Sequence, residues 1–131
     1  MRVFSLTSLL FATTACATAP PPFTVSALGG EGTLHCAASE LRAAGYDVDV
    51  SGTSAEASRV QQLAPAEAER DVVALTLVDG QERLVRADVR RWSYSPSLHD
   101  VPVNRQQIQP VSVDEETSTQ VSRIMRSCQT P

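Results

Sequence analysis

Lysine is absent from this chain, and all of its 11 basic residues are arginines. Acidic residues outnumber them at 15, so the formal net charge is −4. An acidic domain is a poor nucleic-acid binder, because affinity for the phosphate backbone depends on positive charge. No G-x-S-x-G segment is present, which excludes the nucleophile elbow of α/β-hydrolases. The apolar stretch Val3–Ala12 is shorter than the roughly 20 residues that a membrane-spanning helix needs.

The first residues, MRVFSLTSLLFATTAC, have the layout of an export signal. Arg2 supplies a positive start, Val3–Ala12 an apolar stretch, and Thr13–Ala15 the small residues that a signal peptidase requires. A cysteine directly after such a run, here Cys16, resembles the lipobox of bacterial lipoproteins. The resemblance implies cleavage before Cys16 and attachment of fatty acyl chains such as palmitate, which hold the protein on the membrane. Ala17, where an aspartate would imply inner-membrane retention, implies the periplasmic face of the outer membrane.

The lipoprotein interpretation divides the chain into three parts. Residues 1–15 are a signal peptide, residues 16–22 contain the lipidated cysteine and a stiff proline-rich spacer, and residues 23–131 form a single small domain. Cleavage removes Arg2, which leaves ten basic residues against 15 acidic ones and a net charge of −5 (10 − 15). An ordinary secretory signal cut after Ala17 or Ala19 is the alternative, and it would export the same domain without lipid.

Export also bears on the two remaining cysteines. With Cys16 lipidated, Cys36 and Cys128 form an even pair in an oxidising compartment. We predict a disulfide between them that joins the first helix to the last, with two separate buried thiols as the alternative. Two histidines without a free cysteine cannot build a zinc site, so neither a metal nor another cofactor is expected.

Hydrophobic periodicity predicts two helices. An apolar stripe indicates a helix over residues 33–44, with Thr33 as its N-cap and Gly45 at its C-terminal cap. A second helix is predicted to start at Ser112, with Glu115 completing a capping box. Its inner face carries residues spaced by one helical turn: Val121, Ile124, Met125 and Cys128.

Alternating patterns predict strands over residues 23–27, 46–50, 71–78 and 83–94. Residues 71–78 are apolar on both faces, which indicates a central strand. Asp79–Gly80 is predicted to form a tight turn, and a bulge at Arg90–Arg91 is predicted to turn Trp92 and Tyr94 inward. The weaker segments are assigned as a loop over 51–58, an ambiguous stretch over 59–63, and connections over 65–70 and 95–110.

These elements predict an α+β fold. We expect a small two-layer sandwich in which three or four mainly antiparallel strands form the sheet and both helices pack on one of its faces.

Three motifs share residue types with metal or catalytic sites, and each has a simpler explanation. Residues Asp47–Gly52 spell D-x-D-x-S-G, the start of a calcium loop, but Ser58 stands where the closing glutamate belongs and the alternation favours a strand. His35 and Cys36 would diverge by about 100° on a helix and cannot act as a pair. His99–Asp100 lies near Ser93, Ser95 and Ser97 without the rigid scaffold of a hydrolase triad. We therefore predict no catalytic residue and identify no small-molecule substrate.

One stretch is both basic and aromatic, and its candidate binding residues are Arg86, Arg90, Arg91 and Trp92. Guanidinium groups bind phosphate and carboxylate well, although a solvated strand face paired to nearby carboxylates is the alternative. With the anchor, this composition predicts a non-enzymatic structural or assembly accessory of the cell envelope that binds another envelope protein. The alternative function is a ligand- or polymer-binding module that uses the Arg83–Tyr94 strand.

Overall fold

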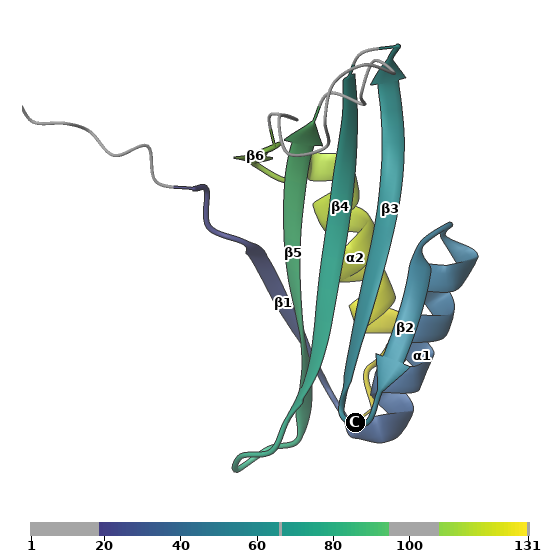
Figure 1. Ribbon diagram of the computed structural model, residues 1–131. Coiled ribbons are helices and arrows are strands. Elements are labelled where there is room, and N and C mark those ends of the chain that lie inside the picture. The colour runs from purple at the N-terminus through teal and green to yellow at the C-terminus, as the bar shows by residue number, and fades with distance from the viewer. Residues whose placement is uncertain (1–18, 66, 95–107, 131) are drawn as a thin grey trace, which may run out of the picture.

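The structure, a computed structural model, describes residues 19–65, 67–94 and 108–130. Cys16, the preceding signal segment, Ser95, Ser97 and His99–Asp100 lie outside these residues. The described chain forms a six-stranded antiparallel sheet with two helices on one of its faces, which confirms the predicted α+β class (Figure 1). Neither of these helices is long and apolar enough to cross a membrane.

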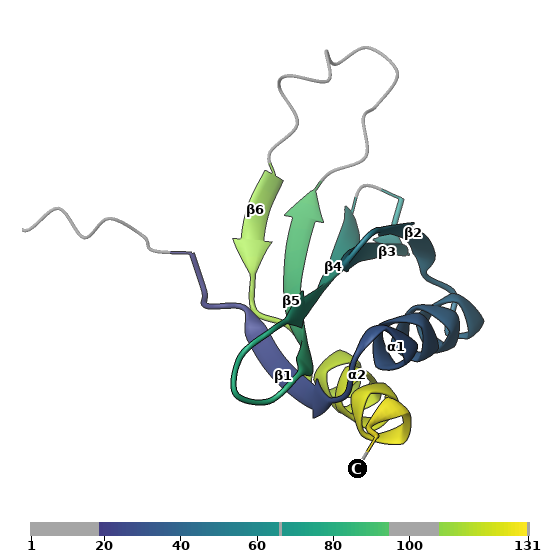
Figure 2. The same ribbon diagram turned by 90° about the horizontal axis from the view of Figure 1, so that it is seen from below.

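Strands and helices follow one another in the order β1 (Phe23–Leu28), α1 (Glu31–Ala43), β2 (Asp47–Ser51), β3 (Ser54–Ala64), β4 (Glu67–Val78), β5 (Leu84–Tyr94), β6 (Ile108–Val111) and α2 (Glu115–Cys128). The sheet order is β1-β5-β4-β3-β2. β6 pairs with the end of β5 that lies beyond β1, so that β1 and β6 share one side of β5. Figure 2 shows both helices on the same side of the sheet, which leaves its other face open.

The prediction of three or four strands was wrong because two strands carry weak hydrophobic patterns. β3 covers the segment assigned as a loop and the ambiguous stretch after it, and it buries only the small side chains of Ala55 and Ala57. β4 begins at Glu67, within a predicted connection, and pairs with β3 as far as its tip. β6 is a four-residue strand with a proline in it, inside the other predicted connection.

The core lies between the sheet and the helices. β4 is central, between β3 and β5, as its apolar sequence predicted. Its buried Val73 and Leu75 meet Leu34 and Leu41 of α1 in one cluster, together with Val121 and Met125 of α2. All four residues predicted on the inner face of α2 are buried. The alanines of the α1 stripe, Ala37 and Ala38, leave less than about 1% of their surface exposed, and small side chains of this kind let a helix approach a sheet closely.

The helix ends agree only in part with the predictions. Gly45 adopts φ +93° directly after α1, and Tyr46 N donates to Leu41 O at 3.0 Å, so the predicted glycine cap is confirmed. The helix starts at Glu31, however, with Gly30 rather than Thr33 as its N-cap. α1 thus starts earlier than predicted, whereas α2 starts later, at Glu115. Asp114, not Ser112, is its N-cap, and the Asp114 carboxylate accepts from Thr117 N at 2.9 Å.

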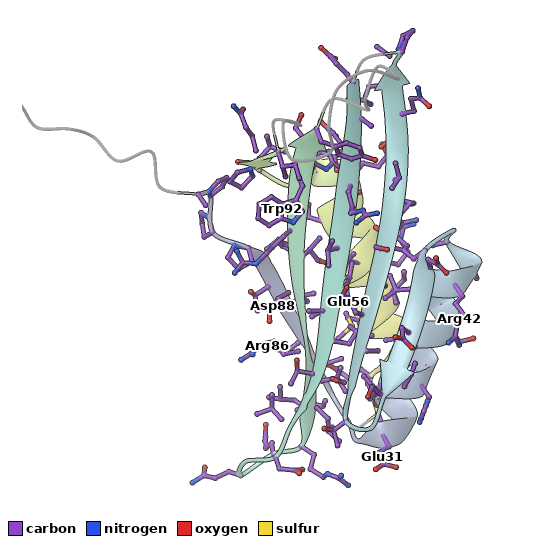
Figure 3. All side chains as sticks on the ribbon, in the orientation of Figure 1. Glu31, Arg42, Glu56, Arg86, Asp88 and Trp92 are labelled. Atoms are coloured by element: carbon purple, nitrogen blue, oxygen red, sulfur yellow. A yellow bond between two sulfur atoms is a disulfide. The ribbon has the colours of Figure 1, made fainter. Side chains whose placement is uncertain are left out.

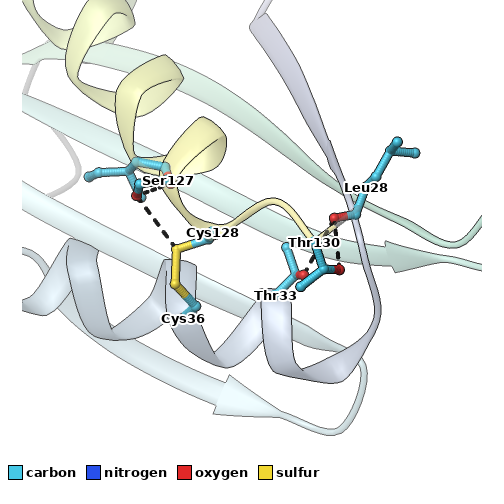
Figure 4. Close-up of a disulfide and its surroundings, with 7 residues drawn as sticks. Leu28, Thr33, Cys36, Ser127, Cys128 and Thr130 are labelled. Atoms are coloured by element: carbon cyan, nitrogen blue, oxygen red, sulfur yellow. Dashed lines mark hydrogen bonds between the residues drawn. A yellow bond between two sulfur atoms is a disulfide. The ribbon is translucent and has the colours of Figure 1, made fainter.

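The predicted disulfide between Cys36 and Cys128 is present and joins α1 to α2 (Figure 4). Its Cα atoms are 5.6 Å apart. Beside it, Thr130 N donates to Leu28 O at 2.9 Å, so the chain that leaves α2 also closes the end of β1. The bridge and this bond hold the C-terminal helix to the first strand and first helix of the domain.

Candidate functional site

The two faces of β5 separate the predicted binding residues. Residues at odd positions from Val85 to Arg91 are buried under the helices, and the even positions face the open side. β5 pairs with β4 without interruption from Tyr94 to Leu84. The predicted bulge at Arg90–Arg91 was therefore wrong, and Trp92 and Tyr94 point to the open face rather than inward. The predicted tight turn after β4 was also wrong, since Val78 pairs with Leu84 around a longer connection.

Arg91 does not belong to a binding surface. Its side chain is 6% exposed and forms a bidentate pair with Asp71, at 2.6 Å from Nε and 3.1 Å from Nη2. Further bonds reach Glu69 at 3.0 Å, Asp114 at 3.2 Å and Thr117 at 3.0 Å. These contacts tie the sheet to the first turn of α2. The assignment of Arg91 as a binding residue is thus corrected: it holds the fold together.

This cluster also shifts the pKa values of Asp114 and Arg91. Burial alone would raise the pKa of Asp114, but bonds from the Thr117 side chain and backbone and the charge of Arg91 outweigh it and lower that pKa. The hydrogen bond to Asp71 raises the pKa of Arg91 further above its already high value. Both groups therefore stay charged throughout the physiological range. An ion-pair network of this kind supports the structure by tying the sheet to α2.

Part of the basic stretch remains on the open face. Figure 3 shows Trp92, Asp88 and Arg86 in succession along β5. Arg86 Nε is 3.1 Å from Asp88 Oδ2, and Asp88 also accepts from Thr24 Oγ1 at 2.7 Å. Arg86 is thus partly neutralised by its neighbour, as the alternative of a solvated strand face supposed. Arg90 is exposed, and none of the ion pairs in the described ranges involves it.

An apolar hollow lies on the open face, at the end of the sheet where β5 pairs with β6. It encloses about 420 Å³ and is lined by two residues of β4, two of β5 and one of β6: Arg70, Val72, Trp92, Tyr94 and Ile108. The strand register explains this convergence, because Arg70 pairs with Trp92 and Tyr94 pairs with Ile108 across neighbouring strands. No described element covers these side chains, and Ile108 is 60% exposed.

Another open hollow, of about 480 Å³, follows the outer side of α2. Its lining comes from one helix and consists of polar and charged side chains: Glu115, Glu116, Thr119, Gln120 and Arg123. Long charged side chains on a solvated helix leave such spaces without a ligand. The hollow on the sheet differs because three strands contribute to it and aromatic rings line it, which is typical of binding surfaces.

The proline spacer lies beside this hollow. Pro20–Pro22 line a small void of about 10 Å³ together with Trp92, Pro110 and Val111, between the ends of β1 and β6. The chain therefore enters the domain next to Trp92. In Figure 1 this entry is at the left of the sheet, and β2 and β3 form the opposite side.

The motifs set aside in the sequence have structural roles or lie beyond the described chain. Asp47 and Asp49 are exposed residues of β2, and Gly52 supplies φ +60° in the turn that follows. Within the described ranges, no group of histidine, cysteine, aspartate or glutamate side chains could hold a metal ion. His35 is exposed on α1, and Cys36 beside it is bonded to Cys128.

Sequence reasoning found Trp92 and Tyr94 on β5 but missed the residues that β4 and β6 contribute. Arg70 lay in a predicted connection, Ile108 in another, and Val72 was assigned to a strand without a face. These residues meet Trp92 only through the register of three strands. Comparison with protein-family models, with curated proteins and with solved structures finds no match for this chain.

Proposed function

We propose that this protein is a lipid-anchored, non-enzymatic binding module of the cell envelope, which holds another envelope protein on the open face of its sheet. The observation that supports this proposal is the hollow formed by Arg70, Val72, Trp92, Tyr94 and Ile108. Tryptophan, tyrosine and arginine are the residues that most often dominate the energy of protein–protein interfaces. An uncovered aromatic and aliphatic surface of this kind is typical of an interaction site.

The anchor and this surface are compatible in space. Ala17, Thr18 and Ala19 separate Cys16 from Pro20, so a lipid on Cys16 would lie within about 15 Å of Pro20 even on a fully extended chain. Pro20 lies at the edge made by β1 and β6. If the membrane lies at that edge, it does not cover the open face of the sheet, and a partner can reach this face. Tethering would also raise the local concentration of the module near any partner in the same membrane.

The anchor itself is tested by the intact mass of the protein extracted from membranes without reductant. We expect the mass of residues 16–131 plus acyl groups, less two hydrogens for the disulfide. Cys16→Ser should move the protein to the soluble fraction, because acyl chains supply about 0.8 kcal/mol per buried CH₂. An unlipidated mass starting after Ala17 or Ala19 would contradict the anchor and leave a secreted binding module.

The binding surface is tested with Trp92→Ala in the full chain. We expect at least an approximately tenfold loss of the protein complex recovered from crosslinked cells, because a buried aromatic anchor at an interface contributes about 2 kcal/mol or more. Leu84→Ala is the matched control, since Leu84 lies on the same face of the same strand at its other end. Equal losses in both variants, or no protein partner in the wild type, would count against the proposal. Circular dichroism should show that both variants remain folded.

A second candidate, binding of an anionic envelope polymer, is favoured by the positions of Arg70 and Arg90. Arg70 on β4 lines the aromatic hollow, and Arg90 is exposed beside it on β5. If this candidate is right, binding should fall steeply with added salt and should be lost in Arg70→Gln combined with Arg90→Gln. A protein partner held mainly by the aromatic surface would retain most of its affinity under both conditions.

A further inference from the structure

Within the described residues, one half of β3 has no strand paired on its outer side. β3 pairs with β4 along nearly its whole length, but β2 covers only the half from Ser54 to Ser58. We call the remainder, Arg59–Leu63, the free β3 edge. Within the described chain, no hydrogen bond outside the β3–β4 ladder involves residues 60–63. Alternate backbone N–H and C=O groups along this edge therefore point outward without a strand to meet them.

The other outer edges of the sheet carry features that the free β3 edge lacks, although on β1 they lie only at its last residue. β1 has Leu28 bonded on its outer side by Thr130 N at 2.9 Å and by the Gln129 side chain at 3.3 Å. β2 is short, carries two exposed aspartates, and has Val48 O bonded by Arg42 Nη2 at 3.4 Å. β6 has four residues, one of them a proline. Short length, charge, proline and capping bonds are the usual devices that prevent a strand edge from pairing.

The free β3 edge has the opposite character. Its sequence from Val60 to Leu63 is uncharged and contains no proline. Val60 is 50% exposed and Leu63 is 53% exposed, which places them among the few large hydrophobic side chains that the described surface exposes. An unprotected edge with apolar side chains is a template for another strand.

We propose that the free β3 edge binds an extended segment of the partner protein as an added strand of the sheet. This inference rests on the proposed function and assigns the form of the partner. Open backbone donors and acceptors on an edge are satisfied best by a second polypeptide in the extended conformation. Val60 lies in register with Arg70, and Arg70 with Trp92, so the added strand would continue the cross-strand row that leads to the aromatic hollow.

A second copy of this chain fits the edge less well. Antiparallel self-pairing about Gln61, the middle of the edge, would set Val60 beside Gln62 of the other copy and Arg59 beside Leu63. Apolar side chains would then meet polar ones at both positions. Centring the pair on Val60 instead would require the outer side of Ser58, which Asp47 of β2 already occupies. The edge is therefore better suited to a segment of different sequence.

The location of the edge agrees with a tethered module. The chain enters the domain beside β1 and β6, and β3 lies on the opposite side of the sheet, as Figure 2 also shows. A membrane near Pro20 would thus leave the free β3 edge directed away from the lipid and open to a partner.

Amide hydrogen exchange on the full chain tests this inference. We compare the protein in its native membranes with the purified protein in vesicles of the same lipids. In native membranes, about half of the amides in residues 60–63 should exchange at least tenfold more slowly, because the other half already bond to β4. Residues 54–58, which β2 covers, should not change.

Val60→Lys should abolish this protection, since a charge on the edge opposes an added strand. Ser54→Lys is the matched control, because Ser54 is exposed on the same face of the same strand but in the half that β2 covers. Lysine at either exposed position leaves the fold intact, which thermal unfolding of both variants verifies.

The possible outcomes separate this inference from the function on which it rests. Equal amide exchange of residues 60–63 in native membranes and in vesicles would overturn the added strand. Loss of the partner in Trp92→Ala would, in that case, still support the open face as the binding surface. If Val60→Lys abolishes the protection and Trp92→Ala does not, the result would support strand addition at the free β3 edge. It would contradict binding at the open face. Protection in the purified protein that grows with concentration, together with dimers in sedimentation, would show a second copy on the edge and overturn the proposal.

Discussion

Replacing Cys36 and Cys128 together by alanine is expected to lower the free energy of unfolding by roughly 4–5 kcal/mol, from the entropy of loop closure. The two residues are 92 positions apart, so the bridge restricts most of the unfolded chain. Cys128 is also buried at 4% exposure, and the sulfur atom lost with it belongs to the core cluster. Urea unfolding of the oxidised protein and of the double variant measures the difference.

The size of this effect follows from the rest of the fold. The domains of small proteins are stable by only about 5–15 kcal/mol in total, so one bridge of this span is a large share. The hydrophobic core contributes less than usual to the stability of the domain, because the side chains buried between β3 and α1 include four alanines: Ala37, Ala38, Ala55 and Ala57. Adding reductant to the wild type should reproduce the loss, and the double variant should not respond to reductant. A loss below about 1 kcal/mol would mean that helix-to-sheet packing, rather than the bridge, holds α2 in place.

Where the pattern of a segment is strong, sequence reasoning predicted the fold well. The apolar run of β4 places it at the centre of the sheet, and the inner stripe of α2 is the one expected. The glycine after α1 adopts the left-handed conformation that only glycine reaches at low cost. Each of these features is decided by neighbours in the sequence or by burial on both sides.

The misassigned segments depend on partners that are distant in the sequence. β3 reads as a loop because alternating alanine and serine gives little hydrophobic contrast, and its strand state comes from pairing with β4. β6 exists because β5 offers it an edge. A short strand with a proline has no local signal, since its stability comes from hydrogen bonds to a neighbour.

The prediction that Arg91 is a binding residue could have been corrected from the alternation of buried side chains along β5. Val85, Ala87 and Val89 are two residues apart and face the core, and the same period places Arg91 beside them. A bulge was expected instead because Arg90 and Arg91 are adjacent in the sequence. Asp71, the main partner, lies on β4 opposite Arg91, and Asp114 lies at the start of α2. Neither contact can be derived before the register of the sheet is known.

Arg91→Met is expected to destabilise the protein by about 3–5 kcal/mol, the effect of removing one partner from a buried ion pair. The Asp71 side chain is 2% exposed. Without Arg91, its nearest positive group is Arg59, whose Nη2 lies 3.7 Å away and is partly solvated. The variant would thus leave a buried carboxylate with one distant partner, and it would also remove the bonds that hold Thr117 and Asp114 at the start of α2.

Two comparisons test whether the destabilisation comes from the buried Arg91 pair or would follow from the loss of any charged side chain. Arg86→Met should change stability by no more than about 0.5–1 kcal/mol, because Arg86 lies on the same strand but its pair with Asp88 is solvent-exposed. Arg91→Met combined with Asp71→Leu should be less destabilised than the sum of the two single variants, because removing both charges leaves neither buried alone. Chemical unfolding of the wild type, Arg91→Met, Asp71→Leu and the double variant gives this coupling energy. A coupling near zero would mean that Arg91 stabilises the domain through its contacts with α2 and not through Asp71.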